Sequence, residues 1–303
     1  MNKIDILYQR IINIRFYLWF LIKRPTSNYY YFLCPYGIGD TLMVAMLAGA
    51  FKKNHCNKKI CLVVKKTHGD IPDMFTKVDK KLICKEIPND LDKYNTFSNG
   101  SLTAVHPSIY FEKGLLPLLG YKGITLIDLY KIILKIPMDS VLERPVINSK
   151  LILSAKHKFR SFNLKKNKTI ILAPEANSSG MVNTSFWIKL SKNLKEAGWT
   201  VCTMSQNPRN YIKGTIKINF DLSEAIPFSE EAGYVISVRS GLCDLLAFSR
   251  ANLKIIYPDE YSYGGKLIDQ VSIVKMGFNS STEEYIYNKN DFLTNEIMKH
   301  LPK

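Results

Sequence analysis

The sequence predicts an α/β protein of two domains, each built on a parallel sheet with helices on both faces. Short apolar, β-prone runs alternate with helical patterns along most of the chain, which is typical of parallel sheets. A stretch with two prolines and then many lysines, residues 137–168, interrupts this alternation once, and we expect the linker between the domains there. The length of 303 residues is sufficient for two domains. We therefore expect an N-terminal segment over residues 1–25, a first domain over 26–150 and a second over 151–303.

The elements of each domain follow from these patterns in chain order. In the first domain we expect strands at residues 29–34, 60–64, 82–87 and 102–105, and helices at 41–53 and 124–135. In the second domain we expect strands at residues 169–173, 199–204, 234–238 and 253–257, and helices at 185–197, 241–249 and 291–300.

The N-terminal segment is predicted to be an amphipathic helix over residues 4–23, because its apolar residues recur at helical spacing. Its longest uncharged run, residues 16–22, is far too short to cross a bilayer. Aromatic residues beside Arg10 and Arg15 suit a helix that lies on an anionic membrane surface. The same pattern also suits a helix that packs on the protein's own core. Both interpretations remain open.

The charge is strongly positive, with 42 Lys and Arg against 26 Asp and Glu, a net charge of +16. Such a surface attracts nucleic acid, anionic lipid or phosphorylated small molecules. The chain carries no RNA-binding signature and no zinc finger, so we do not expect nucleic acid as a partner. Its six cysteines include no Cys-x-x-Cys pair, which indicates reduced thiols, and no metal site or cofactor is expected.

Two glycines follow the first predicted strand, in Gly37-Ile38-Gly39-Asp40. Glycine allows another molecule to approach the backbone closely, and a helix start offers N–H groups to an anion. The motif lacks the third glycine of the dinucleotide fingerprint, and the next strand ends in Lys65 rather than an acid, which argues against a nicotinamide enzyme. Asp40 has two interpretations: a helix N-cap, or a general base that takes a proton from a sugar hydroxyl.

Two further turns follow predicted strands in the second domain. The first carries Glu175, Ser178 and Ser179, and its serines and backbone suit either phosphate binding or a plain polar connection.

The second turn is Arg239-Ser240-Gly241-Leu242, with Asp244 further along the predicted helix. Ser240 and Gly241 suit a phosphate held by backbone N–H groups, and the planar guanidinium of Arg239 suits a diphosphate. The alternative is Ser240 as a helix N-cap, with Arg239 in a surface ion pair. We favour phosphate binding, because open α/β sheets bind ligands at the carboxyl ends of their strands.

These motifs resemble the bacterial heptosyltransferases of glycosyltransferase family 9. The resemblance spans about residues 29–260, and its individual motifs are short. The segments that carry it are residues 37–42, 51–53, 60–64, 171–176, 187–190, 198–201, 222–224 and 234–247.

The resemblance implies a GT-B fold, in which two Rossmann-like domains face each other across a cleft. It implies an inverting, metal-independent transfer of sugar from a nucleotide-diphosphate donor to a glycan or glycolipid acceptor, with Asp40 as the base. Acceptors of the family belong to lipopolysaccharide, which is made at the inner face of the cytoplasmic membrane. The residues that we expect at the donor and its phosphates are Gly37, Gly39, Glu175, Ser178, Ser179, Arg239, Ser240, Gly241, Leu242 and Asp244.

The sequence departs from the family pattern at three of these positions. Glu175 replaces a glycine, Arg239 replaces an acid and Asp244 replaces a histidine. The leading hypothesis is an inverting glycosyltransferase of surface-polysaccharide or lipopolysaccharide assembly. The alternatives are a catalytically inactive glycosyltransferase-like binding protein and, third, a basic nucleic-acid binder.

Overall fold

The computed structural model describes residues 3–24, 28–55, 58–88, 91–94, 100–109, 114–176, 180–205, 207–262, 265–288 and 292–302. The chain divides into two units, and each is described by itself. The first unit comprises Met1–Leu119 and Leu126–Val146, and the second comprises Gly120–Thr125 and Ile147–Lys303. The division after Val146 lies close to the boundary that the sequence analysis places between residues 150 and 151.

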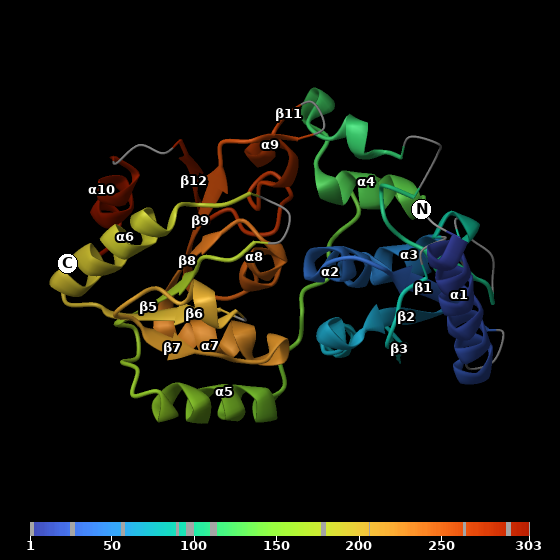
Figure 1. The fold of residues 1–303 in the computed structure, drawn as a ribbon, viewed down its shortest axis with the longest axis horizontal. Helices are drawn as coiled ribbons and strands as arrows, with labels where there is room; N and C mark the ends of the chain where they lie inside the picture. The colour runs from blue at the N-terminus through green and yellow to red at the C-terminus, as the bar shows by residue number, and fades with distance from the viewer. Residues whose placement is uncertain are drawn as a thin grey trace. The chain divides into compact units, whose positions relative to one another are not determined.

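The first unit is built on a four-stranded parallel sheet, as the alternation of strands and helices predicts. The strand order is β3-β2-β1-β4, so β1 lies inside the sheet (Figure 1). The strands are β1 (Tyr29–Cys34), β2 (Lys59–Lys65), β3 (Lys80–Cys84) and β4 (Leu102–Ala104), and the helices are α1 (Lys3–Lys23), α2 (Ile38–Met46), α3 (Ala48–Asn54) and α4 (Leu126–Ile133).

Both faces of the first sheet are covered, because successive side chains of a strand point to opposite faces. On one face, Tyr31 of β1 packs edge-on against Phe20 of α1, with ring centroids 5.1 Å apart. On the other face, Phe32 packs edge-on against Phe51 of α3 at 4.9 Å. The predicted N-terminal amphipathic helix is therefore confirmed, and one of its faces docks on the core.

The helix expected over residues 41–53 differs from prediction. It begins earlier, at Ile38, and Leu47 divides it into α2 and α3. Leu47 has φ −93° and ψ −2°, close to the bridge region of backbone space and outside the regular α-helical range, so the helix is interrupted there. The apolar periodicity continues across this residue, which is why the sequence predicts one helix.

The second unit contains a six-stranded parallel sheet of order β12-β9-β8-β5-β6-β7. If the six strands of this sheet are numbered 1 to 6 in chain order and read from β7, the order is 3-2-1-4-5-6, which is the doubly wound arrangement. A two-stranded antiparallel ribbon, β10 with β11, follows β9. The strands are β5 (Thr169–Ala173), β6 (Thr200–Met204), β7 (Ile216–Ile218), β8 (Gly233–Val238), β9 (Asn252–Pro258), β10 (Tyr261–Ser262), β11 (Gly265–Lys266) and β12 (Glu283–Tyr287).

Helices cover both faces of the second sheet (Figure 1). The helices α6 and α10 pack on one face in a core that includes Trp187 and Ile297. On the other face α7 contacts β5 and β8, and α5 packs on α7. The helices of this unit are α5 (Ser149–Ser161), α6 (Thr184–Glu196), α7 (Ala225–Ala232), α8 (Gly241–Leu246), α9 (Leu267–Val271) and α10 (Phe292–Lys299).

Helix α5 lies within the basic stretch that we expected to be a linker. Asn148 begins it, because its side chain accepts a hydrogen bond from the Leu151 N–H at 3.0 Å. Phe159 anchors it, with its ring 5.3 Å from that of Phe228 in α7. Only Ala155 and Phe159 of α5 are buried, so few apolar residues mark the helix in a sequence rich in lysine. The helical spacing of apolar residues is therefore hard to recognise.

Candidate active site

Gly37 and Asp40 form a tight turn where β1 passes into α2. Gly37 is the N-cap residue of α2, and its N–H donates to the Asp40 Oδ2 at 2.7 Å. A Cβ at position 37 would lie 3.1 Å from that same oxygen, so glycine allows the carboxylate to fold back over the turn. Asp40 is therefore not the N-cap itself; it lies in the first turn of α2 and caps from inside the helix. Gly39 precedes it in the same turn.

The second oxygen of Asp40 meets groups from two other elements. Tyr130 of α4 donates its hydroxyl to Oδ1 at 2.7 Å, and the Nε2 of His106 lies 3.5 Å from the same oxygen. His106 follows β4, which pairs in parallel with β1. The carboxyl ends of parallel neighbours lie at the same edge of a sheet, and this brings His106 to Asp40.

The hydrogen bonds of His106 define where its proton lies. Its Nδ1 accepts from the backbone N–H of Ser108 at 3.1 Å, and the ring packs against Tyr36 with centroids 4.1 Å apart. A neutral imidazole with an accepting Nδ1 carries its proton on Nε2, which is the atom that faces Asp40. His106 thus orients the carboxylate, and neither of its ring nitrogens is directed to take a proton from a substrate.

The environment of Asp40 keeps its carboxylate ionised. Burial raises the pKa of Asp40, but the interactions with His106, together with the hydrogen bonds from Tyr130 and Gly37, outweigh burial and lower the pKa below its ordinary value. The side chain is still 17% exposed, so a substrate hydroxyl has access to it. The site can therefore accept a proton at neutral pH.

The second unit presents two of the predicted turns at adjacent strands. Glu175 follows β5, and Arg239 follows β8, which pairs with β5. The strand order reverses between β5 and β8, because β6 lies beyond β5 and β9 lies beyond β8. Such a switch point is where doubly wound sheets bind their ligands.

Glu175 is occupied by the loop that follows β6. Its Oε1 accepts from the side-chain amide of Asn210 at 2.7 Å, from the Asn207 N–H at 3.2 Å and from the Ser205 hydroxyl. These bonds tie the ends of β5 and β6 together. Ser178 and Ser179 lie outside the described residues.

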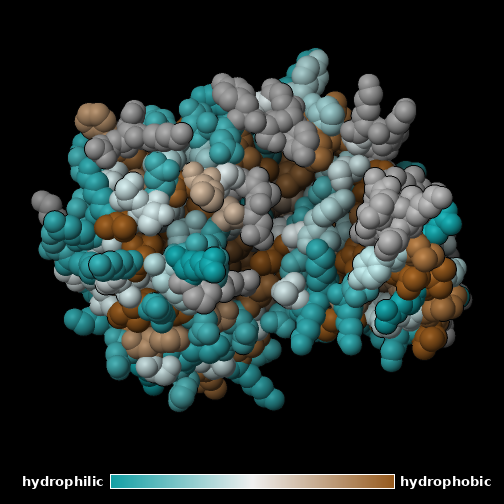
Figure 2. Space-filling view, viewed as in Figure 1, coloured by the Kyte–Doolittle hydropathy of each residue, from teal (hydrophilic) through white to brown (hydrophobic). Residues whose placement is uncertain are grey.

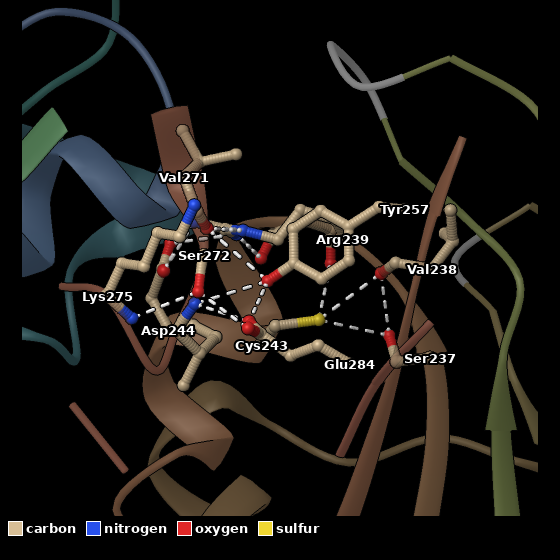
Figure 3. Close-up of polar contacts among 12 residues, drawn as sticks. Ser237, Val238, Arg239, Cys243, Asp244, Tyr257, Val271, Ser272, Lys275 and Glu284 are labelled. Atoms are coloured by element: carbon tan, nitrogen blue, oxygen red, sulfur yellow. Dashed lines mark hydrogen bonds and ion pairs between the residues drawn. The ribbon is translucent and has the colours of Figure 1, made fainter. Parts of the chain in front are cut away.

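Arg239 is buried, and its guanidinium pairs with Asp244 one turn into α8 (Figure 3). Nη2 and Nη1 donate to the two carboxylate oxygens at 2.7 and 3.3 Å, and Nε donates to the Val271 carbonyl at 2.8 Å. Burial lowers the pKa of Arg239, but the charge of Asp244 more than offsets burial and raises it. From the sequence we expect this guanidinium at a donor diphosphate. In the structure it is buried beneath the turn after β8, where it binds Asp244 and the Val271 carbonyl.

A polar network extends this brace to β9 and β12 (Figure 3). Tyr257 donates its hydroxyl to the Glu284 Oε1 at 2.5 Å, and Ser272 donates to Oε2 of the same carboxylate at 2.6 Å. The Ile273 N–H also donates to Glu284 at 2.7 Å. Tyr257 also donates to the Val271 carbonyl that accepts from Arg239, so the turn after β8 is supported by side chains from β9, β12 and α8.

Ser240 is the N-cap residue of α8, with an extended backbone at φ −155° and ψ 170°. Its hydroxyl does not bond to the N–H groups of α8, and Ser240, Gly241 and Leu242 are all partly exposed. This arrangement suits an anion at the turn. Asp244, which we expected at the donor, instead holds Arg239.

The sequence motifs do not identify His106 and Tyr130 as partners of Asp40. His106 directly follows a predicted strand, residues 102–105, so its place at the same sheet edge as Asp40 was available as a signal. Tyr130 lies inside a helix and carries no such signal. Among the described residues, no group of three or more His, Cys, Asp or Glu side chains is arranged to hold a metal ion.

The fold is shared with solved glycosyltransferases. A glycosyltransferase of family 9 from Veillonella parvula matches with a TM-score of 0.60 and 12% identity, over 91% of this chain and 90% of that one. ADP-heptose lipopolysaccharide heptosyltransferase II of E. coli matches with a TM-score of 0.63 and 11% identity, over 89% and 96%. The E. coli heptosyltransferase WaaC, solved with ADP, matches with a TM-score of 0.55 and 12% identity, over 89% and 98%.

These matches confirm the resemblance at the level of the fold, which is that of the family 9 heptosyltransferases. No protein-family model matches the chain. No curated protein matches its sequence.

Proposed function

We propose that this chain is an inverting, metal-independent glycosyltransferase. It moves a sugar from a nucleotide-diphosphate donor to a glycan or glycolipid acceptor of surface-polysaccharide or lipopolysaccharide assembly. The observation that carries the proposal is the Asp40 carboxylate, which is ionised, oriented by His106 and Tyr130, and partly exposed at the carboxyl edge of its sheet. The heptosyltransferase fold supports the same reaction class.

In the proposed reaction Asp40 acts as general base. The acceptor hydroxyl oxygen attacks the anomeric carbon of the donor sugar and gives its proton to Asp40. The new carbon–oxygen bond forms as the bond to the diphosphate breaks on the opposite side, which inverts the anomeric configuration. The nucleoside diphosphate leaves with the electron pair of that bond.

We assign the donor diphosphate to the turn after β8. Ser240, Gly241 and Leu242 line the start of α8, where backbone N–H groups and the positive end of the helix favour negative charge. Arg239 and Asp244 hold this turn from behind. Glu175 fixes the neighbouring loop, and Gly37 and Gly39 shape the turn that presents Asp40.

We place the protein at the inner face of the cytoplasmic membrane, since acceptors of this kind carry lipid. The net charge of +16 supports an anionic surface as partner. The described helices include none long and apolar enough to span a bilayer, so association would be peripheral.

A catalytically inactive nucleotide-sugar-binding protein is the second candidate. The observation that favours it is the departure from the heptosyltransferase pattern at three positions of the expected donor site, Glu175, Arg239 and Asp244. The two candidates differ in whether sugar is transferred.

Thermal-shift measurements with ADP-, GDP-, UDP- and CMP-sugars, with and without EDTA, test the proposal. One nucleotide-sugar class should raise the melting temperature in a concentration-dependent manner, unchanged by EDTA. Release of the nucleoside diphosphate in the presence of acceptor then separates the enzyme from the inactive binder. Loss of binding in EDTA, or the absence of a shift with any donor, would contradict the proposal.

A further inference from the structure

Helix α1 presents two different apolar faces. One face carries Phe16 and Phe20, which are buried against the first sheet. The opposite face is exposed and does not pack on the unit. Its large exposed apolar side chains are Leu7, Tyr8, Ile11, Ile14, Tyr17, Leu18, Leu21 and Ile22.

The exposed side chains form a continuous stripe. Leu7, Ile11, Ile14, Leu18 and Ile22 recur every three or four residues, which places them on one side of a helix. Figure 2 shows the resulting apolar patch over α1, coloured brown. Soluble monomers rarely leave so many neighbouring large apolar side chains in water, and such a patch marks a binding surface.

Cations border the stripe on both sides. Arg10 and Arg15 are exposed, and each lies beside the stripe on the helical circumference, one on either side. Lys23 is exposed at the end of the helix, and the only acid in α1 is Asp5. An apolar stripe with an arginine on either side has the chemistry of a helix in the headgroup plane of an anionic bilayer.

We propose that this outward face of α1 docks on an anionic membrane surface, with the apolar stripe in the acyl boundary and Arg10 and Arg15 on lipid phosphates. Self-association through the same stripe would bring the cations of two copies together, and α1 has only Asp5 to pair with them. A bilayer of anionic lipid supplies the counter-charges instead. The inference deepens the proposed function, because it names the surface that brings the enzyme to a lipid-linked acceptor.

The test is co-sedimentation of the full-length protein with vesicles, and it requires no sugar substrate. Phosphatidylethanolamine vesicles with about 30% phosphatidylglycerol should bind the protein at least tenfold more tightly than phosphatidylcholine vesicles, and salt should weaken binding. The double variant I11S/L18S should lose at least tenfold in binding while keeping the wild-type melting temperature. Leu153→Ser, at a comparably exposed apolar residue of α5, is the matched control and should bind as wild type.

Three results would overturn the inference. Equal vesicle binding by wild type and I11S/L18S would exclude the stripe as the membrane-binding surface. A wild-type protein that stays in the supernatant at low salt would exclude lipid. A dimer that I11S/L18S converts to monomer, without vesicle binding by wild type, would make the face a self-interface. Vesicle binding without any nucleotide-sugar binding would refute the proposed function alone, so the two failures can be told apart.

Discussion

Asp40 depends on residues that lie far apart in the sequence. Its two oxygens are held by Gly37 in the same turn, by Tyr130 in α4 and by His106 after β4. Because His106 and Tyr130 both lower the pKa of Asp40, removing either one should raise it.

The first prediction concerns the pH dependence of turnover in His106→Phe. Phenylalanine keeps a ring against Tyr36 but has no hydrogen-bond donor. In wild type, activity should fall only when acid protonates Asp40 below its ordinary carboxyl pKa, because its folded pKa is depressed. In His106→Phe the acid limb of the kcat/KM profile should move to higher pH. The control is His157→Gln, on an exposed residue of α5, whose acid limb should coincide with that of wild type.

The same linkage predicts a stability change with pH. A carboxyl whose folded pKa is depressed stabilises the fold above its unfolded pKa, and this contribution is lost as pH falls through the folded pKa. Wild type should therefore lose more stability than Asp40→Asn between neutral and acid pH, as followed by thermal melting. Parallel melting curves across that range would show that Asp40 does not stabilise the fold through its charge.

The buried pair of Arg239 and Asp244 leads to a prediction about stability. Asp244→Asn leaves a buried guanidinium without its counter-charge and should destabilise the second unit by about 3–5 kcal/mol in urea unfolding. The matched control is Glu230→Gln, which removes the partner of the exposed Arg250 and should leave the urea midpoint almost unchanged. An Asp244→Asn protein as stable as this control would refute the bracing role of the pair.

The candidate site was only partly predictable from sequence, because some of its residues are close together in the chain and others are far apart. Gly37 and Asp40 are local, since the strand, the turn and the helix start lie in one short segment. The partners of Asp40 come from elements about 70 and 90 residues later: the pairing of β4 with β1 brings His106 to Asp40, and the packing of α4 on α2 brings Tyr130. We expected Arg239 at a diphosphate because the sequence does not reveal its ion pair with Asp244. Asp244 lies one helical turn further along the chain and accepts a hydrogen bond from the guanidinium.

At the scale of elements, α1 has an inner face for stability and an outer face for docking. Phe20→Ala should cost about 3–5 kcal/mol, because it empties a site packed against Tyr31. Ile22→Ala changes a side chain that is 77% exposed and should alter stability by less than about 0.5 kcal/mol. Urea unfolding of the two variants measures the difference. Equal costs would mean that α1 does not dock through the face described here.

Most elements with a clear apolar run were predicted, and the others were missed for physical reasons. The strand at Thr169–Ala173 has the predicted bounds, since it is apolar and buried on both faces. The edge strand β7 alternates over only three residues, and the edge strand β12 begins with two glutamates, so neither contains a clear apolar run. In α5 the many lysines obscure the apolar spacing of a helix. In α7, Pro227 suggests a break in the helix, although it lies in the first turn, where proline is tolerated.

At the scale of the whole molecule, two parallel sheets each deliver a turn to the start of a helix. In the first unit that turn carries a base, and in the second it suits an anion. The sheet order of the second unit places its turn at the point where the strand order reverses. This division of tasks is the core of the proposed function, and the shared heptosyltransferase fold is consistent with it.

The most direct test is the turnover of Asp40→Asn with the donor that the thermal-shift screen identifies. Asparagine keeps the size of the side chain but does not accept a proton at neutral pH. We expect a kcat about 10²–10⁴-fold below wild type, with the donor-induced rise in melting temperature unchanged. A variant that transfers sugar at close to the wild-type rate would contradict this expectation.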